Sequence, residues 1–219
     1  MLFRSTFAFH RYVPPSHPRK GSDQLTYQDE PKWIPGPRFE DAVVYAIRAH
    51  AHQARKGGTI PYLAHLFAVA AHVMEDGGTE DETIGALLHD AGEDQGGEPR
   101  MADIEATFGA AVEAIVRGCS DTLETPKPAW VERKQRYVEH LATASPAVRR
   151  VSLADKVHNT ESMVSDLAVH GEALWQRFNA KRDQQAVYFR GLRDAFRAAG
   201  DRGPLLTRLE AAIGTLFGD

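Results

Sequence analysis

The chain has 219 residues, of which 42% are hydrophobic and 26% are charged, and its formal net charge is −4. This balance is that of an ordinary globular domain, and without an excess of basic residues we expect no broad nucleic-acid binding. No apolar run reaches the roughly 18 to 20 residues of a membrane span, and we expect no secretory signal. The single cysteine, Cys119, cannot form an internal disulfide, which favours a cytoplasmic location.

The N-terminal segment differs in composition from the rest of the chain. Residues 1–37 are rich in Pro, Arg, Ser and His and show no sustained period, so we expect an irregular arm. Apolar residues then recur at helical spacing over 39–51, up to a Lys-Gly-Gly break, and again over 61–76, up to a Gly-Gly pair. We therefore place one domain over residues 38–219 that begins with two helices.

An N-terminal capping pattern predicts the start of a third helix. Thr79 followed by Glu82 is a capping-box pattern, and the helix is expected to run on through Leu88 and into the acidic residues beyond. The apolar residues from 104 to 116 predict a helical pair that bends near Gly109.

The second half of the chain also shows helical patterns and contains no convincing alternating strand. A loop over 122–128 leads into a helix over about 130–141. Ser145-Pro146 starts the next helix, with Ser as the cap and Pro in the first turn. A long helix is expected from about 172 to 199, and Pro204 opens a last one. The sequence therefore predicts an all-α fold in a single domain.

The segment LLHDAGED, residues 87–94, is the most informative stretch of polar side chains. His89 and Asp90 lie about 100° apart around a helix, and Glu93 and Asp94 each follow one of them by four residues. Three acids and a histidine on a helix with otherwise apolar positions would be costly to bury without a cation. This segment therefore indicates a metal site.

Two further segments can supply the remaining metal ligands. His65 and Asp155 each follow or stand among apolar residues, where an unpaired polar side chain would be unfavourable. Mixed imidazole and carboxylate ligands suit Mn²⁺, Fe²⁺ or Zn²⁺, and four protein ligands leave room for water. We expect Mn²⁺ as the cofactor, with other divalent metals as alternatives.

Three motifs in order resemble a known family. They are R-K-x-G-x-x-P-Y-x-x-H at 55–65, H-D-x-x-E-D at 89–94 and L-A-D-K-x-x-N at 153–159. The order His, His-Asp, Asp along the chain resembles that of the HD phosphohydrolases. The three complete motifs resemble those of the (p)ppGpp hydrolase domain of RelA/SpoT-type enzymes. The resemblance covers roughly residues 39–198 and is closest in size to the small alarmone hydrolases. It implies an HD-domain bundle of about ten helices.

The resemblance also implies a role for each matching residue. His65, His89, Asp90 and Asp155 correspond to the Mn²⁺ ligands of the family. Glu93 and Asp94 correspond to the catalytic acidic pair that positions and deprotonates the attacking water. Arg55, Lys56 and Asn159 correspond to residues that contact the nucleotide, its sugar or its phosphates.

Further substrate contacts are expected from basic residues outside the motifs. The segment 175–189 places Arg177, Lys181 and Tyr188 on neighbouring turns, and we name Lys181 and Tyr188 as substrate-binding candidates. Arg133 and Lys134 are similar candidates for phosphate contacts. The aromatic residues of 175–189 are more often part of a core.

The activity implied is hydrolysis of the 3′-diphosphate of (p)ppGpp or a related alarmone, with release of pyrophosphate. Two alternatives stay open: an HD phosphatase that acts on another nucleotide (a dNTP, a 5′-nucleotide or NADPH), and an antitoxin hydrolase that neutralises a toxic alarmone synthetase. The expected partners are a nucleotide substrate, a cognate synthetase toxin and a second copy of the chain, but no membrane.

Ordinary structural roles compete with these assignments. Glu93 and Asp94 could form a solvated acidic helix end, and Arg55-Lys56 a solvated basic one. Asp155 could simply pair with Lys156 or Arg150, and Asn159 could be an ordinary polar helix residue. For His50 and His52, two residues apart and therefore pointing in different directions, we expect core or surface roles.

Overall fold

The computed structural model describes residues 32–218, so residues 1–31 of the expected arm lie outside the described residues. Helices dominate the described part, which contains ten α-helices, one 3-10 helix and no strand. The helices are α1 (Pro37–Ala49), α2 (Leu63–Glu75), α3 (Glu80–Leu88), α4 (Ala91–Asp94), α5 (Gly97–Phe108), α6 (Ala110–Cys119), α7 (Trp130–Leu141), α8 (Pro146–His170), η1 (Gly171–Arg177), α9 (Arg182–Ala198) and α10 (Pro204–Phe217). The expected all-α bundle of about ten helices is confirmed.

Two of the helix starts predicted from caps form as expected. The Thr79 hydroxyl accepts from the Glu82 N–H at 3.3 Å, and the Thr79 N–H donates to the Glu82 carboxylate at 2.7 Å, completing a capping box. The Ser145 hydroxyl accepts from the Val148 N–H, and Pro146 occupies the first turn of α8. These local bonds fix where the two helices that carry His89 and Asp155 begin.

Three helix boundaries differ from the sequence predictions. The expected helix over 172–199 is broken: η1 ends at Arg177, and α9 starts only at Arg182, where the Lys181 N–H bonds the Gln184 side chain. The expected helix through 79–94 is also interrupted at His89 and Asp90, between α3 and α4. Helix α1 ends at Ala49 rather than near residue 51. In each place tertiary and capping contacts override an apolar period that runs across the junction.

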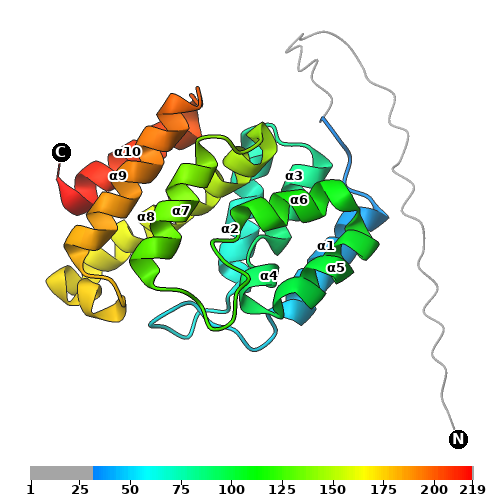
Figure 1. Ribbon diagram of the computed structural model, residues 1–219, viewed down its shortest axis with the longest axis horizontal. Helices are drawn as coiled ribbons and strands as arrows, with labels where there is room; N and C mark the ends of the chain where they lie inside the picture. The colour runs from blue at the N-terminus through cyan, green and yellow to red at the C-terminus, as the bar shows by residue number, and fades with distance from the viewer. Residues whose placement is uncertain (1–31, 219) are drawn as a thin grey trace, which may run out of the picture. The chain divides into compact units, whose positions relative to one another are not determined.

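Helix α8 is the element around which the fold is arranged. Its 25 residues pack against α2, α3, α6 and α10, and Figure 1 shows it passing behind α7. The apolar residues Val151, Ala154 and Val157 are fully buried, which holds Asp155 in the interior beside α2 and α3. Burial of a valine side chain stabilises the fold by roughly 1.5 to 3 kcal/mol, and burial of the alanine methyl group by less.

Gly92 in the acidic segment has a packing role. A β-carbon at this position would lie 2.4 Å from Met101 Sδ, closer than any real contact. A β-carbon would force Met101 to move, so glycine allows α4 to pack closely onto α5, and this packing places Glu93 and Asp94 next to the end of α3.

Candidate metal centre and substrate cleft

Four side chains from three parts of the chain converge on one point. The Nε2 atom of His65, on α2, lies 3.3 Å from Nε2 of His89, at the end of α3, and 3.2 Å from Oδ1 of Asp155, on α8. Asp90 joins them, with its Oδ2 atom 2.9 Å from His89 Nε2 and 3.6 Å from His65 Nε2. Ligand atoms of His65, His89 and Asp155 all lie within 4.8 Å of one another. The predicted ligands are therefore brought together.

This donor set fits a divalent cation. Two imidazole nitrogens that face each other, together with two carboxylates, offer the nitrogen and oxygen ligands that bind Mn²⁺, Fe²⁺ or Zn²⁺. His65, His89 and Asp155 are at most 6% exposed, so no bulk water screens their charges. A cation at the point that they share would satisfy all of them.

The charged groups of this cluster strongly shift one another's pKa values. Burial by itself lowers the pKa of His89, but the carboxylates of Asp90 and Asp155 outweigh it and raise this pKa well above its ordinary value. Burial raises the pKa of Asp90, yet His89 and His65 hold it well below the usual range. The cluster therefore binds positive charge strongly in its interior.

Neighbouring groups fix the orientation of the two histidines. The His89 ring places Nδ1 2.8 Å from the Ala86 carbonyl, which accepts a hydrogen bond from the ring N–H, so Nε2 is the atom left to face the cluster. His65 Nδ1 lies 2.8 Å from Nδ1 of His158. Burial, followed by His65 and Arg55, lowers the pKa of His158 to about 4, so this ring is neutral at neutral pH. Both rings are thus oriented by contacts behind the site.

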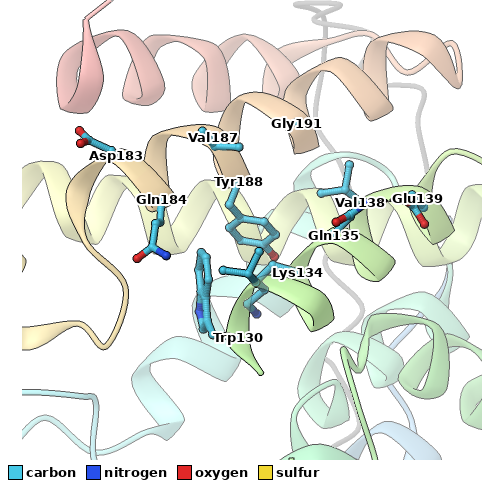
Figure 2. A pocket seen from close by; sticks show the side chains of 11 residues that line it. Trp130, Lys134, Gln135, Val138, Glu139, Asp183, Gln184, Val187, Tyr188 and Gly191 are labelled. Atoms are coloured by element: carbon cyan, nitrogen blue, oxygen red, sulfur yellow. Dashed lines mark hydrogen bonds between the residues drawn. The ribbon is translucent and has the colours of Figure 1, made fainter. Parts of the chain in front are cut away.

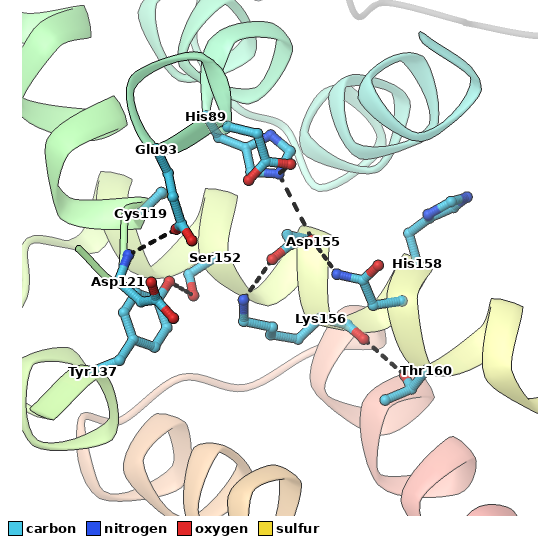
Figure 3. A network of polar contacts seen from close by, with 12 residues as sticks. His89, Glu93, Cys119, Asp121, Tyr137, Ser152, Asp155, Lys156, His158 and Thr160 are labelled. Atoms are coloured by element: carbon cyan, nitrogen blue, oxygen red, sulfur yellow. Dashed lines mark hydrogen bonds and ion pairs between the residues drawn. The ribbon is translucent and has the colours of Figure 1, made fainter. Parts of the chain in front are cut away.

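The two carboxylates are oriented in the same way. The Tyr62 hydroxyl donates to Asp90 Oδ2 at 2.6 Å. Lys156 Nζ donates to Asp155 Oδ2 at 2.6 Å, as Figure 3 shows, so that Oδ1 of Asp155 is left facing the histidines. Lys156 is one of the partners that the sequence offered for Asp155. The other, Arg150, instead pairs with Asp76 and Glu82.

Lys156 is predicted to control how well the site binds metal. Its ammonium is buried against the ring of Tyr137, 4.9 Å from the ring centre. Burial lowers its pKa, but Asp155 outweighs burial and keeps it well above the ordinary value. Lys156→Met keeps the stem and removes the bond to Asp155, so the affinity for Mn²⁺ is expected to fall about 10- to 100-fold, as for other residues that orient metal ligands. Calorimetric titration with Mn²⁺ measures this, and unchanged affinity in a folded variant would contradict it.

The acidic pair lies beside the cluster. Glu93 accepts from Lys127 Nζ at 2.9 Å and from the Asp121 N–H at 3.2 Å, and Figure 3 shows Glu93 and Asp121 facing each other. Asp94 accepts from the Gln53 side chain at 2.9 Å. Burial and then the Asp121 carboxylate raise the pKa of Glu93, while Lys127 opposes them. A buried carboxylate with a raised pKa is suited to accept a proton near neutral pH.

Asp121 is a residue of this site that the sequence did not single out. Its carboxylate is 4% exposed and pairs with Lys134 at 2.6 Å and with Arg133 at 2.5 Å. Arg133 Nη1 consequently stays 3.9 Å from Glu93. Asp121 and Lys127 both lie in the loop between α6 and α7, where no period or motif marked them.

The Asp121 carboxylate is predicted to make folding sensitive to acid. Burial raises its pKa, but Lys134, the hydrogen bond with Glu93 and then Arg133 together outweigh burial and lower it to about 2, against an ordinary 3.8. A depressed pKa stabilises the fold above the unfolded value, so this contribution is lost as the pH falls from about 4 to about 2 and is worth about 2 kcal/mol. Urea denaturation between pH 6 and pH 2 should therefore show that the free energy of unfolding of Asp121→Asn, about 2 kcal/mol below that of the wild type at pH 6, approaches the wild-type value at the acidic end. A constant difference would contradict this.

A cleft of about 1040 Å³ opens in front of the cluster. Four of the predicted substrate-binding residues line it: Arg55, Lys56, Asn159 and Tyr188. Lys181 does not line it; this residue is exposed at the N-cap of α9, and its substrate role stays a prediction. Arg55 donates to Asn159 Oδ1 at 2.9 Å, and Asn159 in turn donates to Asp155, so basic cleft residues are linked directly to the cluster.

Tyr188 stands between this cleft and a second cavity. The second cavity, of about 530 Å³, lies between α7 and α9 and shares Trp130, Lys134 and Tyr188 with the cleft (Figure 2). Lys134 Nζ lies 5.1 Å from the centre of the Tyr188 ring. Lys134 therefore reaches the cleft, as the sequence suggested, and connects it to Asp121.

The other histidines singled out in the sequence do not join the cluster. His50 is buried and its Nδ1 lies 2.7 Å from the Gln53 side chain, a core role as expected.

None of the described helices is long and apolar enough to cross a bilayer.

The fold and the paired His and Asp residues define the class of protein, and the chain belongs to the HD domain family, whose model matches residues 42–185. The human guanosine-3′,5′-bis(diphosphate) 3′-pyrophosphohydrolase MESH1 is 35% identical over 127 residues, which are 56% of this chain and 68% of that protein. The Drosophila melanogaster MESH1 is 31% identical over 166 residues, 74% of this chain and 87% of that protein. The expectation drawn from the three motifs is confirmed.

A solved structure is similar over most of the fold. It is described as a metazoan ortholog of SpoT that hydrolyzes ppGpp and plays a role in starvation responses. It aligns with a TM-score of 0.68 and 28% identity, and covers 82% of this chain and 96% of that one. The similarity therefore extends beyond the motifs to the arrangement of the helices.

Proposed function

We propose that the chain hydrolyses the 3′-diphosphate of guanosine-3′,5′-bis(diphosphate), or of a close alarmone, and releases pyrophosphate. The activity is that of the MESH1 relatives, two of which match this chain at 31% and 35% identity. The observation that carries the proposal is the convergence of His65, His89, Asp90 and Asp155 beside Glu93 and Asp94, at a cleft lined by cations.

The reaction transfers the 3′-pyrophosphoryl group to water. Oxygen of water forms a bond to the phosphorus next to the sugar, the bond from that phosphorus to O3′ breaks, and O3′ leaves with a proton. A bound metal lowers the pKa of water and neutralises charge on the phosphoryl oxygens. Glu93, whose pKa is raised by burial and by Asp121, accepts the proton of the attacking water.

The remaining residues of the cleft bind and orient the substrate. Arg55 is fixed by Asn159 and lies over the ring of Tyr62, 5.8 Å from its centre, so its guanidinium is held at the cleft wall. Lys134 is held by Asp121 next to the acidic pair. Fixed cations aimed at phosphoryl oxygens stabilise the charge that develops in the transition state.

We place manganese at the centre as the resident metal, because two imidazoles with two carboxylates suit it. His65, His89, Asp90 and Asp155 would hold it.

We also propose a cytoplasmic location, which agrees with the single cysteine, Cys119. This residue is buried, and because burial raises its pKa, it is an unreactive thiol.

The test is a product assay on the purified chain with Mn²⁺. Pyrophosphate is expected from ppGpp and pppGpp, with little phosphate or pyrophosphate from dGTP or NADPH. Phosphate and pyrophosphate are measured separately, and the same samples with a chelator give the background. Absence of pyrophosphate from ppGpp, pppGpp and ppApp alike would remove the proposed function, whereas release from NADPH alone would favour the alternative phosphatase.

A further inference from the structure

The cleft runs along one face of α8, away from the metal centre. Asn159, Ser162, Asp166 and His170 recur at intervals of three or four residues and all line it. Asp155 lies one turn before Asn159 on the same face. At 1.5 Å per residue, Asp166 lies roughly 16 Å along α8 from Asp155. The cleft is thus long enough for an elongated ligand whose far end lies near Asp166.

A cation from another element is held at that far end. Arg177, the last residue of η1, lines the cleft, and its Nη1 atom lies 3.3 Å from Asp166 Oδ2. Its side chain is 28% exposed, so the guanidinium faces the cleft rather than the core. Its stem packs on Gly57, where a β-carbon would lie 3.0 Å from Arg177 Cδ. The close approach and the positive φ of 78° both favour glycine there.

A second cation stands beside it. Lys56 precedes Gly57 and also lines the cleft, with its Nζ 5.8 Å from the centre of the Phe178 ring and 3.4 Å from Asn179 Oδ1. Lys56 and Arg177 therefore form a cationic pair, one from the 54–60 loop and one from η1, at the end of the cleft remote from Asp155.

We infer that Arg177, together with Lys56, binds the 5′-phosphate groups of the substrate and so makes the site selective for nucleotides phosphorylated at both ends of the sugar. The inference rests on the proposed function, which anchors the 3′-diphosphate at the metal centre and leaves the 5′ end to extend along α8. A guanidinium offers paired donors that match phosphate oxygens, and Asp166 holds it in place.

Contacts to a part of the substrate that does not react have a recognisable kinetic signature. They strengthen the ground state and the transition state alike, so their loss raises KM and leaves kcat nearly unchanged. A charge-assisted hydrogen bond to phosphate corresponds to about a tenfold or larger change in affinity. A structural role for Arg177 would instead change kcat or stability for every substrate equally.

The experiment compares ppGpp with guanosine 3′-diphosphate that carries a 5′-hydroxyl. The wild type is expected to show a KM for ppGpp at least about tenfold lower. Arg177→Met retains the stem that packs on Gly57 and should erase this preference, with kcat changed less than about twofold. Arg48→Met, at an exposed arginine of α1 outside the cleft lining, is the matched control and should keep the preference. An Arg177→Met variant that keeps the preference would overturn the inference.

A binding measurement separates this inference from the proposed function. Calorimetry with GDP and guanosine needs no turnover, and the wild type should bind GDP more tightly than guanosine, whereas Arg177→Met should not. If no pyrophosphate is released from ppGpp but this difference holds, the 5′-phosphate site stands and the proposed reaction fails. If wild-type protein binds GDP and guanosine equally, the 5′-phosphate site fails whatever the activity. Should Arg177→Met not fold, Arg177→Gln provides the same comparison.

Discussion

Replacing Asp155 with asparagine is expected to lower the affinity for Mn²⁺ at least about 100-fold and to reduce pyrophosphate release to near background. Asparagine keeps the shape of the side chain but removes the charge that faces His65, 3.2 Å away, and Lys156, 2.6 Å away. The ligand set loses half of its carboxylates, and the buried ammonium of Lys156 loses its counter-ion. Removing one partner of a buried ion pair destabilises a fold by roughly 3 kcal/mol.

The two consequences are measured separately. Calorimetric titration of the metal-free protein gives the affinity for Mn²⁺, and urea denaturation without metal gives the free energy of unfolding. Asp183→Asn, at an exposed acid in the first turn of α9, is the control and should leave both unchanged. An Asp155→Asn variant that binds Mn²⁺ as tightly as the wild type would exclude Asp155 as a ligand.

Replacing Glu93 with glutamine is expected to lower kcat by about 10²- to 10⁴-fold while Mn²⁺ still binds. Glutamine preserves the shape of the side chain and one of the two acceptor oxygens, which can keep the bond from either the Asp121 N–H or Lys127, but it cannot take up a proton. The variant therefore separates proton transfer from metal binding. If the variant lost Mn²⁺ binding as well as activity, Glu93 would act on the metal centre rather than on water.

The pH dependence tests the same assignment. A general base works only when deprotonated, so the rate falls as the pH is lowered through the pKa of Glu93. Burial and the Asp121 carboxylate raise this pKa above its ordinary 4.5, which places the acidic limb of the wild-type profile above that value. The limb should vanish from the residual activity of Glu93→Gln. A wild-type rate that stays constant down to pH 4 would contradict the role.

Glu93→Gln also tests the antitoxin expectation. When the chain is produced together with a toxic alarmone synthetase, wild-type protein should restore growth and the variant should not, if protection comes from turnover. Protection that survives the substitution would instead indicate neutralisation by binding.

The helices could largely be predicted because their signals are local. Caps such as Thr79 with Glu82, and Ser145 with Pro146, act within one turn, and they form as the sequence indicates. The break between η1 and α9 was not predictable from the apolar period, which continues across 178–181. Its position depends on how Trp175 packs with Phe178 and with Phe217 at the end of α10, and this packing is a tertiary property.

The sequence by itself determined which residues can bind a metal, because ligand chemistry resides in residue types: histidine and aspartate in three ordered motifs identified His65, His89, Asp90 and Asp155. Only the tertiary structure decided how these side chains are aimed and what surrounds them. Asp121, Lys127 and Arg177 lie in loops and helix ends, whose positions follow from packing between distant segments rather than from any local pattern. The long-range contacts that hold Glu93 near Lys127, and Arg177 near Gly57, are therefore absent from the one-dimensional pattern and exist only in the folded chain.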